Sequence, residues 1–218
     1  PGSGAVIPPG GTLVPGSEVD DAVVGVLLPF ATVIYGNPVA SGAGIQVSTN
    51  GTVQFVATGG SLALANSALP AAVFGTAVPV LLPLWDDLDL RSTGGGIYTQ
   101  TIGAAPNRQF LIEWRGRHFS ESSGPQSINF AVVLNEGASG AFEYRYVQTG
   151  TSAAVANGLS ATVGIQAANA GTIFTQSSFD QAVVNPGRVL AGALPQAICS
   201  PGPGICIGGN QLFINGFE

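Results

Sequence analysis

The feature that most constrains this chain is an alternation of apolar and polar side chains with a period of two residues. It recurs in three segments, residues 109–115, 127–135 and 142–146. In the first of them, Phe110, Ile112 and Trp114 share one side of the alternation. Because successive side chains of a β-strand point to opposite faces, this pattern predicts antiparallel strands with one face buried. No long segment carries an apolar stripe with the 3.6-residue period of a helix.

Turn signals separate these segments and suggest how many strands there are. Asn50-Gly51 lies between the apolar segments 45–48 and 52–56, and this dipeptide favours a two-residue hairpin turn with positive φ at both positions. About a dozen short strands predict an all-β fold: an antiparallel two-sheet β-sandwich, jelly-roll-like, with extended terminal tails. We expect an extended N-terminal tail, a single sandwich domain and a C-terminal extension with a final strand, over residues 1–17, 18–191 and 192–218.

Charge is scarce and unevenly distributed. Only 8% of the 218 residues are charged and the formal net charge is −6, so the chain lacks the basic surface that nucleic acids require. From Ala22 through Trp85 there is no Asp, Glu, Lys or Arg. Charge depletion is a property of interface cores. The chain is therefore either a secreted domain coated with neutral polar side chains or a subunit that packs against copies of itself.

The sequence also indicates a compartment. Prolines interrupt the most apolar stretch, residues 68–85, so we expect no transmembrane helix. Residues 1–4 read like a mature terminus left after removal of a signal peptide. Cys199 and Cys206 flank a Pro/Gly-rich turn, and we expect them to form a disulfide, which favours an extracellular location. With two Cys and one His in the chain, a cysteine-based zinc site is not expected.

Acidic residues gather at one place in this charge-poor chain, as Asp86, Asp87 and Asp89. Clustered carboxylates on a loop suit Ca²⁺, so these three are the candidate metal ligands. The alternative is a solvated strand end where they accept hydrogen bonds from backbone N–H groups of the turn. No other cofactor is expected.

His118 is the single histidine, and serines follow it at positions 120, 122 and 123. A Ser-His-Asp arrangement would need His118 as its base. The G-x-S-x-G turn of one class of such enzymes is absent, and the neighbouring arginines favour a surface loop. We therefore expect no catalytic residue and no enzyme activity.

Several segments follow one another in a characteristic order: residues 35–37, 48–55, 83–89, 95–98, 106–114, 129–137, 142–146 and 161–166. As a set they resemble the extracellular β-sandwich modules of secreted bacterial proteins, which are distantly similar to nidogen-type domains with a Phe/Leu-Trp-x-Asp-x-Asp segment. Residues 212–218 separately resemble an Ile-Phe-x-Asp-Gly-Phe-Glu ending of certain secreted bacterial proteins, with Asn215 in place of the usual Asp. The resemblance spans residues 25–170 and implies a mostly non-catalytic module that accompanies adhesive, structural or protease-bearing chains.

Two functions from different classes are compatible with these patterns. The first is a secreted structural subunit that self-assembles into an extracellular filament or surface layer by donating a terminal strand to a neighbour's sheet. Its candidate assembly residues are apolar positions of both tails: Val6, Ile7, Leu13, Val14, Leu212, Phe213 and Ile214. The alternative is an extracellular carbohydrate- or calcium-binding module that is accessory to a secreted enzyme or adhesin.

The carbohydrate alternative depends on exposed aromatic rings. The rings that are candidates for stacking on a sugar belong to Trp85, Tyr98, Trp114, Tyr144 and Tyr146. Trp114, Tyr144 and Tyr146 fall on the apolar side of the alternation, which predicts that they lie in the core and not on a binding face.

Overall fold

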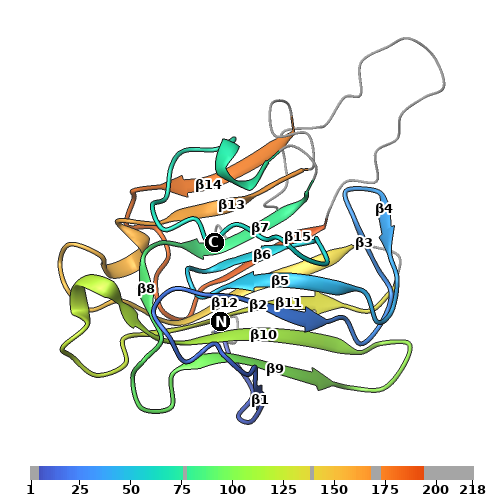
Figure 1. Cartoon of the computed structure of the whole chain (residues 1–218), viewed down its shortest axis with the longest axis horizontal. Coiled ribbons are helices and arrows are strands. Elements are labelled where there is room, and N and C mark those ends of the chain that lie inside the picture. The colour runs from blue at the N-terminus through green and yellow to red at the C-terminus, as the bar shows by residue number, and fades with distance from the viewer. Residues whose placement is uncertain (1–4, 76–77, 138–139, 168–172, 194–218) are drawn as a thin grey trace.

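The computed structural model describes residues 5–75, 78–137, 140–167 and 173–193, which form two antiparallel sheets packed face to face (Figure 1). In the seven-stranded sheet the strand order is β1 (Thr12–Leu13), β9 (Gly96–Ile102), β10 (Gln109–His118), β11 (Ile128–Asn135), β12 (Ala141–Thr149) and β15 (Val189–Ala193), and β8 (Leu88–Asp89) also pairs with β10. In the six-stranded sheet the order is β14 (Phe174–Phe179), β13 (Thr162–Gln166), β7 (Val80–Trp85), β6 (Thr52–Gln54), β5 (Gly44–Ser48) and β2 (Val23–Leu27).

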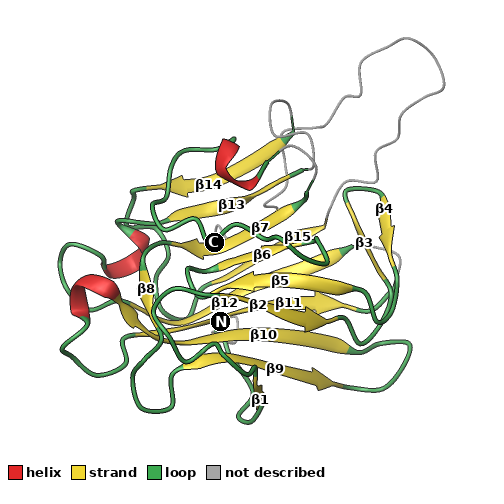
Figure 2. Ribbon diagram, in the orientation of Figure 1, coloured by secondary structure: helices red, strands yellow, loops and turns green. Residues whose placement is uncertain are grey.

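The remaining elements are small. A two-stranded ribbon consists of β3 (Thr32–Ile34) and β4 (Asn37–Val39). In the described residues the helical segments are three 3₁₀ turns, η1 (Ala72–Phe74), η2 (Phe119–Glu121) and η3 (Ala156–Gly158) (Figure 2). The predicted all-β antiparallel sandwich is confirmed.

The main core lies between the two sheets, on the face that the alternation predicted. Trp114 of β10 is opposite Phe130 of β11, and their rings stack with centroids 5.0 Å apart. The polar atoms of these large side chains bond across the sandwich: Trp114 Nε1 donates to Ser48 O at 2.8 Å, and Tyr146 OH donates to Pro83 O at 2.6 Å. Trp114, Tyr144 and Tyr146 are fully buried, so they form the core and not a sugar-binding face.

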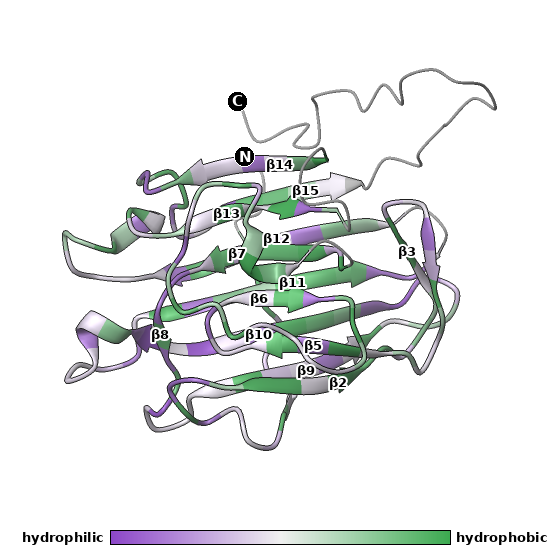
Figure 3. Cartoon of the chain, turned by 45° about the horizontal axis from the view of Figure 1, so that its top comes forward, coloured by the Kyte–Doolittle hydropathy of each residue, from purple (hydrophilic) through white to green (hydrophobic). Residues whose placement is uncertain are grey.

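A second apolar cluster covers the outer face of the six-stranded sheet. Leu82 and Trp85 of β7 pack there against Leu69 and Phe74 from the segment that precedes this strand. Trp85 Nε1 donates to Ala63 O at 2.7 Å. Strand β7 is therefore buried on both faces, which explains why its sequence is continuously apolar instead of alternating (Figure 3).

The N-terminal segment lies on the chain's own seven-stranded sheet. Ala5 N donates to Gly187 O at 2.8 Å, the side chain of Arg145 reaches Val6 O at 3.2 Å, and Arg115 reaches Gly10 O at 2.7 Å. Strand β1 then pairs with β9 at the edge of this sheet. We call residues 5–14 the N-terminal strap. Of the predicted assembly residues, Leu13 pairs within the chain, Val14 packs against the core, and Val6 is 63% exposed.

Predictions for the C-terminal region fall on residues 194–218, outside the described residues. They are the disulfide between Cys199 and Cys206 and the final strand with Leu212, Phe213 and Ile214. The last described strand, β15, ends at Ala193.

Candidate site at the acidic end of the sandwich

A buried turn between β5 and β6 brings two acidic segments together. Asn50 in this turn has no exposed surface. Its Nδ2 donates to Asp21 Oδ1 at 3.0 Å, and its Oδ1 accepts from Leu88 N at 2.9 Å. One amide side chain therefore holds the segment before β2 against the bend between β7 and β8.

The turn itself differs from the predicted two-residue hairpin. Ser48 pairs with Thr52, so three residues form the turn, and of these only Gly51 has positive φ, at 75°. A Cβ built on Gly51 would lie 1.9 Å from Leu84 O, which is closer than any side chain permits. Gly51 is thus required for a close approach of two backbones as well as for its φ. Because Asn50 is buried here, the Asn50-Gly51-Thr52 sequence does not present an accessible glycosylation acceptor.

The carboxylates that meet at this end are Asp20, Asp21 and Asp87, each with an oxygen within 4.8 Å of the others. Asp20 Oδ2 lies 3.1 Å from Arg91 Nη2, whereas Asp20 Oδ1 is buried and has no hydrogen-bond partner. Burial raises the pKa of Asp20 and of Asp87, and the negative charge of Asp21 raises both further. Oxygen atoms grouped in this way are the ligand set that a hard cation such as Ca²⁺ prefers.

The predicted metal ligands Asp86, Asp87 and Asp89 have different neighbours from one another. Of the three, Asp87 joins the Asp20–Asp21 pair. Asp89 has no exposed surface and accepts from Arg91 Nε at 2.8 Å and from Arg117 Nη2 at 3.0 Å. A calcium ion held by all three stays a prediction. Asp89 has two guanidinium partners in the structure, which occupy its carboxylate in place of a metal ion.

Asp86 forms part of a chain of contacts with His118 and Ser120. His118 Nε2 lies 3.1 Å from Asp86 Oδ1, and His118 Nδ1 lies 2.8 Å from Ser120 Oγ. Nε2 is buried and forms no hydrogen bond, so Asp86 is a close neighbour of the ring and not its hydrogen-bond partner. His118 is 8% exposed, in contrast to the surface loop that the sequence indicated.

These contacts have a structural explanation. The backbone N–H of Ser120 donates to His118 Nδ1 at 3.1 Å, so the histidine caps the short helical turn η2. Ser120 does not line the neighbouring cleft, so its hydroxyl does not face the site where a substrate would bind. Asp86, His118 and Ser120 thus contact one another in the order of a catalytic triad. Their contacts hold the end of β10 and the turn η2 that follows it.

A cleft of about 520 Å³ opens beside the acidic carboxylates. It is lined by Leu64, Ala65, Asn66, Asp86, Asp87, His118, Leu159, Ser160 and Asp180. Ser160 Oγ donates to Asp86 Oδ2 at 2.7 Å, and Asn66 Nδ2 donates to Asp180 Oδ1 at 2.9 Å. Its lining carries carboxylates and no aromatic ring other than the imidazole, so it suits a cation better than a sugar.

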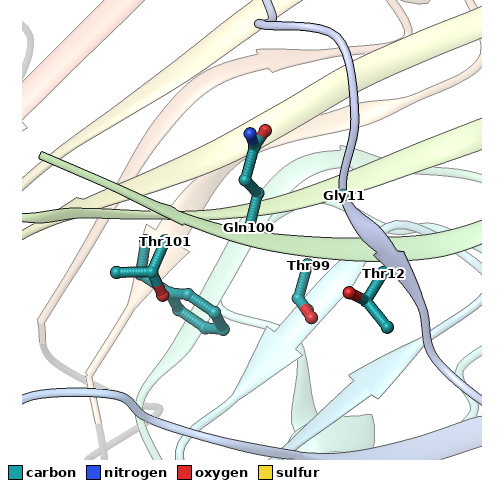
Figure 4. A pocket seen from close by; sticks show the side chains of 6 residues that line it. Gly11, Thr12, Thr99, Gln100 and Thr101 are labelled. Carbon is teal, nitrogen blue, oxygen red and sulfur yellow. The ribbon is translucent and has the colours of Figure 1, made fainter.

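A second groove of about 440 Å³ lies where β1 meets β9. Figure 4 shows Gly11 and Thr12 of the strap on one side and Thr99, Gln100 and Thr101 of β9 on the other. β1 pairs only with Tyr98 and Thr99, so the end of β9 continues past it along this groove.

Sequence reasoning missed several residues of the acidic end. Asp20 and Asp21 lie far from Asp87 in the chain, and no spacing rule connects them. The sequence around Asn50 predicts only a hairpin turn, and the arginines near His118 favour only a surface loop. The available signal was charge itself: in a chain with long uncharged stretches, Asp20 and Asp21 directly precede one of them and Asp86 and Asp87 directly follow it.

A family model described as NIDO related matches residues 4–189, which include every strand from β1 through β14. No curated protein and no solved structure matches the chain. In the part of the chain that the structure describes, no helix is long and apolar enough to cross a membrane. The resemblance to nidogen-type domains is therefore confirmed at the level of the family, and the chain belongs to the NIDO-related family.

Proposed function

We propose that this chain is an extracellular, non-catalytic structural subunit that assembles with copies of itself through its sheet edges. The observation that carries the proposal is that the six-stranded sheet ends in strands whose outer edges are unpaired and uncharged. Both β2 and β14 lack charged residues and proline, but β14 has a bulge at Ser177, whereas β2 pairs with β5 without a register shift. Among the described residues, no other strand pairs with their outward edges.

Unprotected edges are unusual in proteins that remain single. An edge strand presents a row of unpaired N–H and C=O groups, and soluble proteins guard such edges with lysine, proline, bulges or short strands. The edge strand β1 has such a guard, since it has two residues and lies between Pro9 and Pro15. Strand β2 instead ends in Leu27, whose side chain is 70% exposed. This contrast favours an edge that another strand covers in the assembled state.

The charged residues support a structural function over a catalytic one. Five of the six arginines hold a carboxylate of the same chain within 3.1 Å. His118 caps η2, and Asp89 forms ion pairs with two guanidiniums. Membership of the NIDO-related family, together with the expected disulfide, supports an extracellular location.

The direct test is size-exclusion chromatography with light scattering over a concentration series of the full chain. We expect the measured mass to exceed 21.8 kDa and to rise with concentration, as an open assembly requires. A mass that stays at 21.8 kDa up to about 100 μM, far above the dissociation constant of a functional assembly, would overturn the proposal.

Calcium binding is a second candidate function, favoured by the buried, unpartnered Asp20 Oδ1 within the Asp20–Asp21–Asp87 group. Burial and the nearby charge of Asp21 raise the pKa of Asp20 and Asp87, and Ca²⁺ at this group would offset the charge repulsion. We expect millimolar Ca²⁺ to raise the melting temperature of the wild type but not of Asp87→Asn. Glu18→Gln, which changes an exposed carboxylate outside both the group and the cleft, is the matched control. Equal melting temperatures of the wild type with Ca²⁺ and with EDTA would exclude this function.

A further inference from the structure

We infer that β2 is the acceptor edge of the assembly and that the donor is the C-terminal segment, residues 211–215, of a neighbouring copy. This inference rests on the proposed self-assembly and adds the two surfaces that meet. It concerns one side of the sandwich, where β2 ends the six-stranded sheet.

Hydrogen bonding within the chain shows which groups of β2 point outward. Thr49 N donates to Ala22 O at 2.9 Å and Leu28 N donates to Ala43 O at 3.0 Å, so both ends of β2 bond to the β5 side. Antiparallel pairing alternates between bonded and non-bonded positions. Val24 and Val26 therefore bond to β5, and the N–H and C=O groups of Val23, Gly25 and Leu27 point to the open edge.

The open edge also has an apolar surface. Val24 and Val26 belong to the main core and retain 8% and 7% exposure at its margin. On the other face, Leu27 is the most exposed large hydrophobic side chain of the described residues. An added strand would cover apolar surface on both faces while it pairs the free backbone groups. β14 offers less, because its middle residues are Thr, Gln and Ser.

The C-terminal segment has the composition of such a strand. Gln211-Leu212-Phe213-Ile214-Asn215 has five residues, as β2 does, and carries no charge or proline. Its alternation puts Leu212 and Ile214 on one face and Phe213 on the other. Apolar side chains would thus meet both the core margin and Leu27.

The position of β15 relative to β2 favours a neighbour over the same copy, and the linking segment is long enough to reach one. Residues 194–210 separate the donor from β15, and at about 3.5 Å per residue they span up to about 60 Å. β15 lies toward the β14 side of the sandwich and β2 toward the β9 side (Figures 1 and 3). Because the described chain ends at β15 on one side and the acceptor lies on the other, the contact would be head-to-tail, and such a contact propagates into an open filament when it does not close.

The test uses two full-length variants, each defective in one partner. Gly25→Pro removes an outward N–H but no bond to β5, and proline is tolerated on an edge strand in this position. Phe213→Asp places a charge in the donor. We expect each variant alone to stay at 21.8 kDa. A mixture of the two should form a dimer of twice that mass, because one intact donor and one intact acceptor remain.

Two measurements keep the test decisive. Circular dichroism and thermal melting establish that Gly25→Pro is folded. If it is not, Leu27→Lys replaces it, with Val73→Lys as the matched control, since Val73 is an exposed apolar residue of η1 at 50%. A synthetic peptide of residues 208–218, added in excess to the wild type, should shorten the assemblies, whereas a scrambled peptide should not.

The outcomes separate this inference from the proposed function. A wild type that stays monomeric contradicts both. If the wild type, Phe213→Asp and the β2 variants all assemble equally well, the proposed function stands and the inference is overturned. Loss of assembly in the β2 variants but not in Phe213→Asp also overturns it, because pairing of β2 with another β2 would then be the contact.

Discussion

At the scale of single residues, the acidic end depends on a buried carboxylate. Asp89 has no exposed surface, and the side chain of its partner Arg117 is 15% exposed. Removing one member of a buried ion pair leaves the other charge uncompensated, which costs more than the pair itself contributes. The structure therefore assigns Asp89 to stability and leaves cation binding to other carboxylates.

Asp89→Asn should lower the free energy of unfolding by about 3 kcal/mol. Chemical denaturation at pH 7 measures this value, and Asp180→Asn, which removes an exposed carboxylate, provides the control. A loss below about 0.5 kcal/mol, within the usual range for surface substitutions, would show that Asp89 is not a structural ion-pair partner.

The same pair predicts a pH dependence. Burial works to raise the pKa of Asp89, but hydrogen bonds from Arg91 and Arg117 outweigh burial and lower it to about 2 from the ordinary 3.8. Because the folded-state pKa is the lower one, the contribution is fully present above about pH 5 and is lost as the pH falls toward 2. Denaturation curves between these pH values should show a smaller decline for Asp89→Asn than for the wild type, and parallel curves would refute the assignment.

Gly51→Ala tests the close approach of the β5–β6 turn to β7. Its methyl group would overlap Leu84 O, and alanine disfavours the φ of 75°. We expect a loss of about 3 kcal/mol or more, measured by thermal and urea denaturation. Gly16→Ala is the matched control, because Gly16 also has positive φ but nothing lies near its added Cβ. Equal losses in the two variants would assign the effect to φ alone.

At the scale of elements, the alternation predicted the strands that have one buried face, such as β10 and β11. It did not reveal that β7 is buried on both faces, because a continuous apolar run does not show which segment packs on its outer face. Contacts between distant segments were also beyond a local pattern: nothing in the sequence near Asn50 indicates that its amide bonds to Leu88 and Asp21. The sequence predicts an extended N-terminal tail, but it does not indicate that β1 pairs with β9 of the same chain.

The N-terminal strap gives a prediction at this scale. Deleting residues 1–14 removes β1 from the edge of β9 and takes Val14 away from the core. We expect the midpoint of urea denaturation to fall by an amount equivalent to about 2 kcal/mol, from lost apolar burial and hydrogen bonds. Val6→Ser, at a side chain 63% exposed, should have no measurable effect. If the deletion leaves the midpoint unchanged, the strap does not contribute to the fold.

At the scale of the whole molecule, the sandwich uses its charges internally and leaves its uncharged strand edges free. Its aromatic side chains link the two sheets, five of its six arginines hold a carboxylate of the same chain, and its acidic end gathers three carboxylates near a cleft. In the part of the chain that the structure describes, β2 is an end strand whose outward backbone groups pair with no other strand. This distribution is compatible with the proposed assembly, in which the partner is another strand.

Electron microscopy of the full chain at micromolar concentration, with and without EDTA, tests this account most directly. We predict regular filaments in both conditions, because the contact consists of backbone hydrogen bonds and apolar side chains and needs no cation. Filaments that disappear in EDTA would place a metal ion in the contact and contradict assembly through uncharged edges alone. Dispersed particles of 21.8 kDa in both conditions would contradict self-assembly itself.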